Sequence, residues 1–146
     1  MTGSAQIVSV ERTIPADAQA IFDVLANPAR HAEIDGSDMV QEARLDAPDR
    51  LTLGSKFGMK MKFYGLPYRI SNLVVEFEEG RRIAWRHFGR HIWRYELEPV
   101  EGGTLVTESF EWGTAPVPKF YELVGYPAAH EGNMSRTLER LEAVVS

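Results

Sequence analysis

Apolar side chains in the first third of the chain follow first a strand-like and then a helix-like spacing. In residues 5–14 they recur at nearly every second position, which predicts a strand. After Asp17, a typical N-cap residue, they return at intervals of three and four over residues 18–25 and predict a helix. Residues 27–34 open on Asn-Pro, a cap followed by a first-turn proline, and predict a second short helix.

The middle of the chain consists of short apolar segments separated by glycine-bearing turns. Consecutive short strands joined by tight turns favour an antiparallel meander. The expected strands lie at residues 38–45, 54–63, 67–78, 81–88, 91–99 and 103–113.

The last segment changes to a helical period. In residues 127–145, side chains spaced four, four, three and four apart form one stripe along a helix. The stripe is His130, Met134, Leu138, Leu141 and Val145. A long amphipathic helix must cover its stripe, and the sheet is the large partner available. We therefore expect an α+β helix-grip fold in one domain over residues 1–146. A curved antiparallel sheet of about seven strands would surround the long C-terminal helix, with two short helices after the first strand.

The separation of polar from apolar residues predicts the register of the hairpin around Gly89. An odd-numbered loop centred on this glycine puts apolar and charged residues on opposite faces, whereas a two-residue loop mixes them. The inward face would then hold Ile83, Trp85, His87, His91, Trp93, Tyr95 and Leu97. The outward face would hold Arg82, Arg86, Arg94, Glu96 and Glu98.

Neighbouring strands extend the inward wall. Val106, Phe110 and Trp112 share a face with Glu108, which would lie opposite Tyr95. Met59, Met61 and Phe63 share a face of an earlier strand. Methionine adapts to irregular apolar shapes, so this wall can be ordinary core or the lining of a cavity.

Glu108 is the unexpected polar residue of this wall. A buried carboxylate is costly unless it is paired or protonated. One interpretation is a structural partner such as Tyr95, an arginine or water. The other is a ligand anchor, or a general acid/base whose pKa burial raises. His130 is either a helix-end residue or a polar group at the cavity end. The catalytic candidates are Glu108, Tyr95 and His130.

Composition narrows the function classes. The 146-residue chain has a net charge of −5, which disfavours nucleic acid and anionic membrane surfaces as partners. It has no cysteine, so disulfides and thiolate chemistry are excluded. His87 and His91 are expected at a cavity mouth rather than on a metal, and no cofactor is expected. An apolar run long enough for a membrane span and a signal-peptide pattern are both missing, which favours a cytoplasmic protein.

Several motifs resemble the START-like (SRPBCC) superfamily, which includes polyketide cyclases, birch-pollen-allergen proteins and lipid-transfer domains. They are TIPADA at residues 13–18, IFDVL at 21–25, NPARH at 27–31, GRRIAW at 80–85, WRYELEP at 93–99, GGTLV at 102–106 and TLERL at 137–141. These motifs are structural and cover nearly the whole chain. The resemblance implies a helix-grip fold with a cavity between sheet and long helix. It carries over no catalytic motif.

Three functions stay open at this point: a binding or carrier module for a small hydrophobic molecule such as a lipid or polyketide, a cyclase or dehydratase, and an interaction protein whose groove holds a peptide. The first is preferred, and the oligomeric state is left open. The expected ligand-binding residues are Met59, Met61, Phe63, Trp85, His87, His91, Trp93, Tyr95, Glu108, Phe110, Trp112, His130, Met134 and Leu138.

Overall fold

Strands and helices follow one another in the predicted order. The computed structural model describes residues 7–34, 40–43, 50–63, 66–87, 92–111 and 126–145. Its elements are β1 (Ile7–Ile14), α1 (Ala18–Leu25), the 3-10 helix η2 (Pro28–Arg30), α2 (His31–Ile34), β2 (Val40–Ala43), β3 (Lys56–Phe63), β4 (Leu66–Glu78), β5 (Arg82–His87), β6 (Ile92–Val100), β7 (Gly103–Glu111) and α4 (Tyr126–Val145). The predicted α+β helix-grip class is confirmed.

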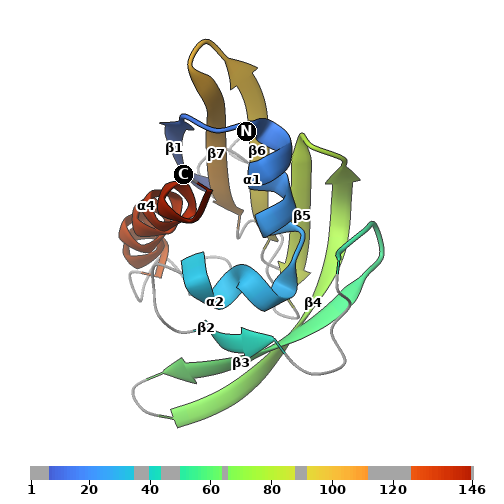
Figure 1. The fold of residues 1–146 in the computed structure, drawn as a ribbon. Coiled ribbons are helices and arrows are strands. Elements are labelled where there is room, and N and C mark those ends of the chain that lie inside the picture. The colour runs from blue at the N-terminus through green and yellow to red at the C-terminus, as the bar shows by residue number, and fades with distance from the viewer. Residues whose placement is uncertain are drawn as a thin grey trace, which may run out of the picture.

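The seven strands form one antiparallel sheet in the order β1-β7-β6-β5-β4-β3-β2. Strands β2 to β6 each pair with the next strand along the chain, and β1, at the far edge, pairs with β7. The sheet is strongly curved, and α1, α2 and α4 all lie on its concave side (Figure 1). Side chains that point into this concavity are therefore enclosed by sheet and helices.

Both short helices begin at the residues that the sequence indicated. Asp17 has an extended backbone, and its Oδ2 accepts a hydrogen bond from the backbone N–H of Gln19 at 3.2 Å. Asn27 caps the next helix in the same way, with its Oδ1 accepting from Ala29 N–H at 3.0 Å. These bonds satisfy N–H groups that have no partner inside the helix. The caps fix the residues at which α1 and η2 begin.

The hairpin register around Gly89 is confirmed. Trp85 lies directly opposite Trp93, and Ile83 opposite Tyr95, so all four point to the concave side. The alternate residues of β5 and β6, with Arg94 among them, point to the convex side. Polar and apolar side chains therefore separate across this hairpin as the odd-numbered loop required.

A β-bulge in β4 changes which residues face the interior. The ladder with β5 shifts by one residue between Val74 and Glu76. A bulge inserts one extra residue into a strand, so side chains beyond it switch faces. Phe77 thus points inward, where its ring meets that of Phe22 edge to face at a centroid distance of 5.5 Å. Glu76 is left on the convex face.

The core divides into two clusters along α4. Leu138 and Leu141 join the larger one, which contains the buried face of α1 with Ile21 and Phe22. Met134 joins a smaller one with Phe110 of β7. The predicted helix stripe is thus buried at Met134, Leu138 and Leu141, and Val145 is half-buried.

Candidate functional site

The concave face of β5, β6 and β7 carries a row of three aromatic side chains. Trp85, Trp93 and Phe110 occupy equivalent positions on adjacent strands. The rings of Trp93 and Phe110 are 4.6 Å apart between centroids. Phe110 is fully buried, whereas both tryptophans are only half-buried. Part of the aromatic surface of Trp85 and Trp93 is therefore not covered by the core.

The next row across the same strands contains a buried polar pair. Tyr95 lies opposite Glu108, and the Tyr95 hydroxyl donates a hydrogen bond to Glu108 Oε2 at 3.0 Å. Glu108 is 2% exposed and Tyr95 is 5% exposed. A carboxylate this deep depends on hydrogen bonds to offset its lost hydration. The predicted position of Glu108, inside and beside Tyr95, is therefore correct.

His31 is a wall residue that the sequence reasoning missed. Its ring stacks on Trp85 at 5.1 Å and meets Phe57 at 5.7 Å between centroids. Its Nε2–H donates to the backbone carbonyl of Leu25 at 2.8 Å, which fixes the ring at the start of α2. Trp85 lies 5.7 Å from the ring of Tyr95, so aromatic contacts extend from His31 to the polar pair.

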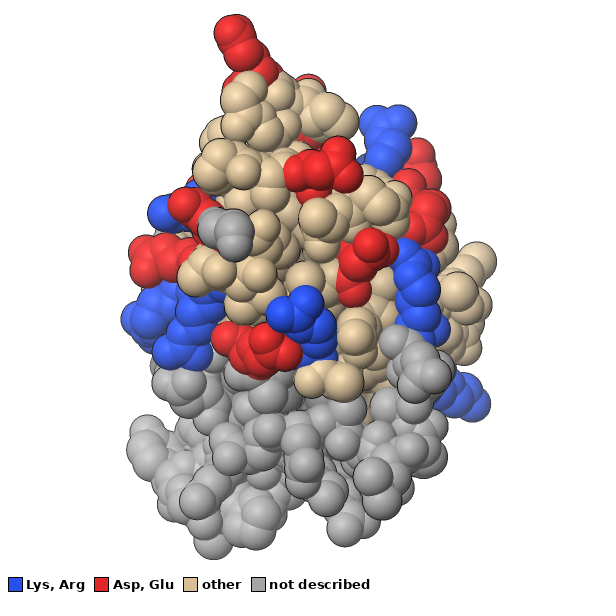
Figure 2. Space-filling view, in the orientation of Figure 1, with Lys and Arg blue, Asp and Glu red and all other residues tan. Residues whose placement is uncertain are grey.

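The arginine between Trp93 and Tyr95 in the sequence points away from this wall, as predicted. Arg94 lies on the convex face, where Nε and Nη2 bond both carboxylate oxygens of Glu76 at 2.9 and 2.7 Å. Its Nη1 reaches Glu111 at 3.3 Å. Hydrogen bonds from Arg94 hold the pKa of Glu76 below its ordinary value, and Glu76 in turn raises the pKa of Arg94. On the described part of one face, Figure 2 shows basic and acidic side chains interspersed.

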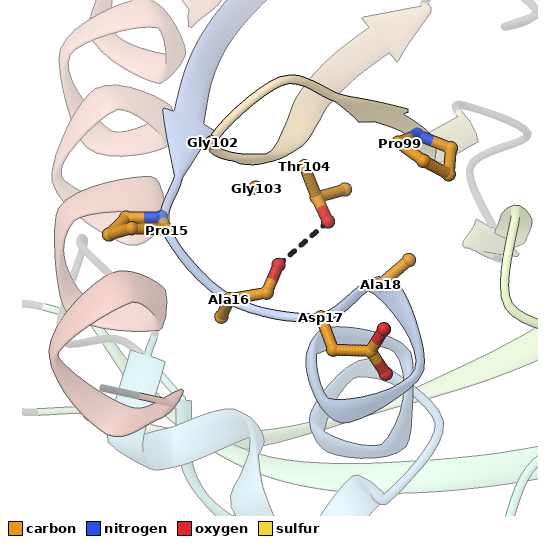
Figure 3. A pocket seen from close by; sticks show the side chains of 8 residues that line it. All are labelled: Pro15, Ala16, Asp17, Ala18, Pro99, Gly102, Gly103 and Thr104. Carbon is orange, nitrogen blue, oxygen red and sulfur yellow. Dashed lines mark hydrogen bonds between the residues drawn. The ribbon is translucent and has the colours of Figure 1, made fainter.

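A separate open pocket of about 390 Å³ lies at the end of the molecule where β1 leads into α1 (Figure 3). The β6–β7 turn forms its other side, and Thr104 Oγ1 donates to the carbonyl of Ala16 at 2.8 Å across it. Asp17, its charged residue, already caps α1. Its lining is Pro15, Ala16, Asp17, Ala18, Pro99, Gly102, Gly103 and Thr104. None of these is a predicted site residue, so this pocket is not the cavity expected between the sheet and the long helix.

Comparison with known proteins identifies the family. A family model described as "Polyketide cyclase / dehydrase and lipid transport" matches residues 5–146. The chain belongs to this family. The description of this family names polyketide cyclases, dehydrases and lipid transport. The resemblance to the START-like superfamily, inferred from the sequence motifs, is confirmed.

Relatives of this polyketide cyclase and lipid transport family extend the similarity without assigning an activity. An uncharacterized protein of Mycobacterium tuberculosis H37Rv is 37% identical over 139 residues, covering 92% of this chain. The chain spans 62% of the length of that relative. A second uncharacterized protein, from M. tuberculosis CDC 1551, is 36% identical with the same coverage of both chains.

Solved structures share the fold of this family member. A protein from Rhodobacter sphaeroides has a TM-score of 0.75 at 18% identity, covering 99% of this chain and 94% of its own. Protein NE0264 from Nitrosomonas europaea has 0.74 at 19%, covering 95% and 93%. A Polyketide_cyc-like protein from Corynebacterium glutamicum has 0.59 at 21%, covering 96% and 89%. Identities this low establish the fold alone.

Part of the predicted site lies outside the described residues. His91 and Trp112 are in that group, and so are the side chains of Met59, Met61, Phe63, His87 and His130. Their backbone places are known: Met59, Met61 and Phe63 pair with β4, His87 pairs with Asn72, and His130 lies in α4. The structure brings together Trp85, Trp93, Tyr95, Glu108, Phe110 and Met134.

Metal binding and membrane spanning each place requirements on the described part of the chain. Within it, no cluster of three or more His, Asp or Glu side chains is placed to hold a metal ion. Within those same ranges, none of the helices combines the length and hydrophobicity needed to span a membrane.

Proposed function

We propose that the chain binds a small hydrophobic molecule, such as a lipid or polyketide, between the concave face of the sheet and α4. The observation that carries this proposal is the partial burial of Trp85 and Trp93. Both point inward from central strands, yet they stay half-buried, whereas Ile83 and Leu97 beside them are closed into the core. Binding sites for small molecules are concave and mostly apolar, with a few placed polar groups.

The proposed lining keeps the residues inferred from the sequence except Leu138, which is buried in the larger core cluster, and adds His31 and Phe57. Trp85 contacts both of the added rings, which belong to α2 and β3. The Tyr95–Glu108 pair supplies the polar group that orients a ligand. α4 closes the site through Met134, which packs with Phe110.

A retained ligand is the direct test. Native mass spectrometry of the protein as purified from cells is expected to show an added mass that is lost after extraction with organic solvent. The uncharged dye Nile red then tests the emptied protein. Trp93→Ala should weaken dye binding, whereas Ile92→Ala, from the convex side of the same strand, should leave it unchanged. Equal effects of the two substitutions, or a wild-type protein that binds neither ligand nor dye, would contradict the proposal.

A second function, cyclisation or dehydration of a polyketide-like substrate, is favoured specifically by the Tyr95–Glu108 pair. A carboxyl and a phenol in hydrogen-bond contact can relay a proton to a bound substrate. Glu108→Gln keeps the shape of the side chain and removes its ionisation. If the pair is catalytic, binding should persist while turnover falls by about 100-fold or more. Turnover that survives this substitution would leave binding as the function.

A further inference from the structure

Asn72, in the middle of β4, is a buried residue whose side-chain amide makes no hydrogen bond within the described part of the chain. Six polar or charged residues are buried in those ranges, and the other five each form a side-chain hydrogen bond: His31, Thr104, Glu108, Ser109 and Thr137. Asn72 is only 4% exposed. A buried amide without a partner costs free energy, so its presence calls for an explanation.

Asn72 lies on the wall of the proposed ligand site. It is directly opposite Phe57 of β3 and two residues from Val74, which is opposite Trp85 of β5. Opposite residues of paired strands share a face of the sheet, and so do alternate residues of one strand. The Asn72 side chain therefore points to the concave side, one row from the half-buried Trp85. The rings of Phe57 and Trp85 meet edge to face beside it, at a centroid distance of 5.5 Å.

The strand itself gives no reason for an asparagine at this position. β4 is paired on both sides, with β3 and β5, and backbone groups form those ladders. Asparagine is depleted in strands, and on a face shared with Phe57 and Val74 an apolar residue would pack without loss. The amide of Asn27, by contrast, caps a helix. The polar atoms of Asn72 therefore fit a partner that enters the site better than they fit the fold.

The chemistry of the amide indicates what that partner offers. Asparagine is uncharged and presents one acceptor oxygen and two N–H donors. A ligand oxygen against Nδ2–H would give the amide its missing hydrogen bond, whereas a hydrocarbon would leave it bare. Ligand sites use a few placed polar groups of this kind to fix orientation. Resting on the proposed binding function, we infer that Asn72 contacts the ligand directly and selects a hydrophobic molecule with an uncharged oxygen, a ketone or a hydroxyl, over a pure hydrocarbon.

A matched pair of probes tests this selectivity. The ketone 2-acetylnaphthalene and the hydrocarbon 2-ethylnaphthalene have similar shapes and differ in one oxygen. Their affinities are measured by displacement of Nile red from the delipidated full chain. Asn72→Leu replaces the amide by an apolar group of the same branching. The ratio of the ketone affinity to the hydrocarbon affinity should fall about threefold to tenfold in this variant, which is the range of one neutral hydrogen bond.

Urea denaturation of the ligand-free protein separates a ligand contact from a structural one. Asn72→Leu should leave the urea midpoint unchanged or raise it, because the variant no longer buries an amide without a partner. The control is Thr104→Val, at a buried residue outside the proposed site whose hydroxyl donates to the carbonyl of Ala16 at 2.8 Å. This variant should lower the midpoint and keep the wild-type affinity ratio.

The possible results divide cleanly between the two proposals. An affinity ratio unchanged in Asn72→Leu, as an amide that keeps a water would give, overturns the contact and leaves the binding proposal intact. A midpoint lowered in Asn72→Leu as in Thr104→Val overturns it as well, because the amide would then stabilise the fold. A wild-type protein that does not bind Nile red overturns both.

Discussion

Glu108 is a buried carboxyl group with a hydrogen-bond partner on the adjacent strand. Its carboxylate lies in the same row of the sheet as Tyr95 of β6 and Val10 of β1. Val10 offers no hydrogen bond, whereas the phenol of Tyr95 donates one to the carboxylate at 3.0 Å. Removing one partner of a buried hydrogen bond to a charged group usually costs more than the bond contributes, because the remaining group stays dehydrated.

Tyr95→Phe should therefore lower the free energy of unfolding by about 1.5–3 kcal/mol. The cost should be smaller when Glu108 is already glutamine, because a neutral amide needs less stabilisation than a carboxylate. Urea denaturation of the wild type, both single variants and the double variant measures this coupling as a double-mutant cycle. A coupling free energy of zero would show that the hydroxyl does not stabilise the carboxylate.

The two glycines of the β6–β7 turn are predicted to differ sharply in their tolerance of a side chain. Both have positive φ, 88° at Gly102 and 152° at Gly103. A Cβ on Gly102 would meet nothing within 4 Å, whereas one on Gly103 would collide with the carbonyl oxygen of Ile14. Gly102→Ala should cost about 1–2 kcal/mol from its backbone conformation alone.

Gly103→Ala should cost distinctly more than this control, about 3 kcal/mol or above, because backbone on both sides must also move. Chemical denaturation of the two variants in parallel gives the comparison. Equal losses would mean that β1 can move away from the turn at little cost.

At the scale of elements, the bulge in β4 sets up an ion pair that bridges three strands. It leaves Glu76 opposite Ala84 of β5, and Ala84 is opposite Arg94 of β6. Because alanine is small, the guanidinium reaches across β5 to the carboxylate, and Ala84 is fully buried beneath them. A bidentate pair of this kind fixes strand positions more firmly than a single-contact surface pair.

This pair predicts how stability depends on pH. In the folded chain, Arg94 lowers the pKa of Glu76 below its ordinary value of 4.5. The stabilisation from this pair is therefore complete above pH 4.5 and is lost as the pH falls through the lowered pKa of the folded state. Glu76→Gln should reduce the free energy of unfolding by about 1 kcal/mol at pH 6 and by much less at pH 3. The control is Glu98→Gln, at an exposed position of β6. A loss for Glu76→Gln that stays the same from pH 6 to pH 3 would contradict the assignment.

The alternation of polar and apolar residues and the glycines in the turns were sufficient to predict the hairpin register and the place of Glu108. A shift of one residue in the strand pairing would bury charged side chains. The bulge in β4 was not predicted, although the inward apolar residues change from even-numbered to odd-numbered positions between Val74 and Phe77. His31 was missed for another reason. A short helix carries no periodicity that tells which strand it covers, so its stacking on Trp85 depends on tertiary packing.

At the scale of the whole molecule, α4 serves two regions of the interior. Toward its C-terminus, Leu138 and Leu141 pack into the cluster that also holds α1, and Arg12 of β1 pairs with Glu142. Nearer its start, Met134 meets Phe110 and the half-buried Trp93. The first region fastens the helix to the sheet, and the second borders the proposed ligand site.

Met134→Ala and Leu138→Ala are predicted to separate these two roles. Both side chains are buried, so each substitution should destabilise the ligand-free protein by about 2–5 kcal/mol. Met134→Ala should also change the affinity for Nile red, since the lost side chain reshapes the wall beside Phe110 and Trp93. Leu138→Ala should leave that affinity within about twofold of wild type, because affinity follows only the contacts that a ligand makes. Denaturation and dye titration of the same samples measure both quantities. If Leu138→Ala changed the affinity as much as Met134→Ala, the ligand would have to lie against the larger cluster, between α4 and α1.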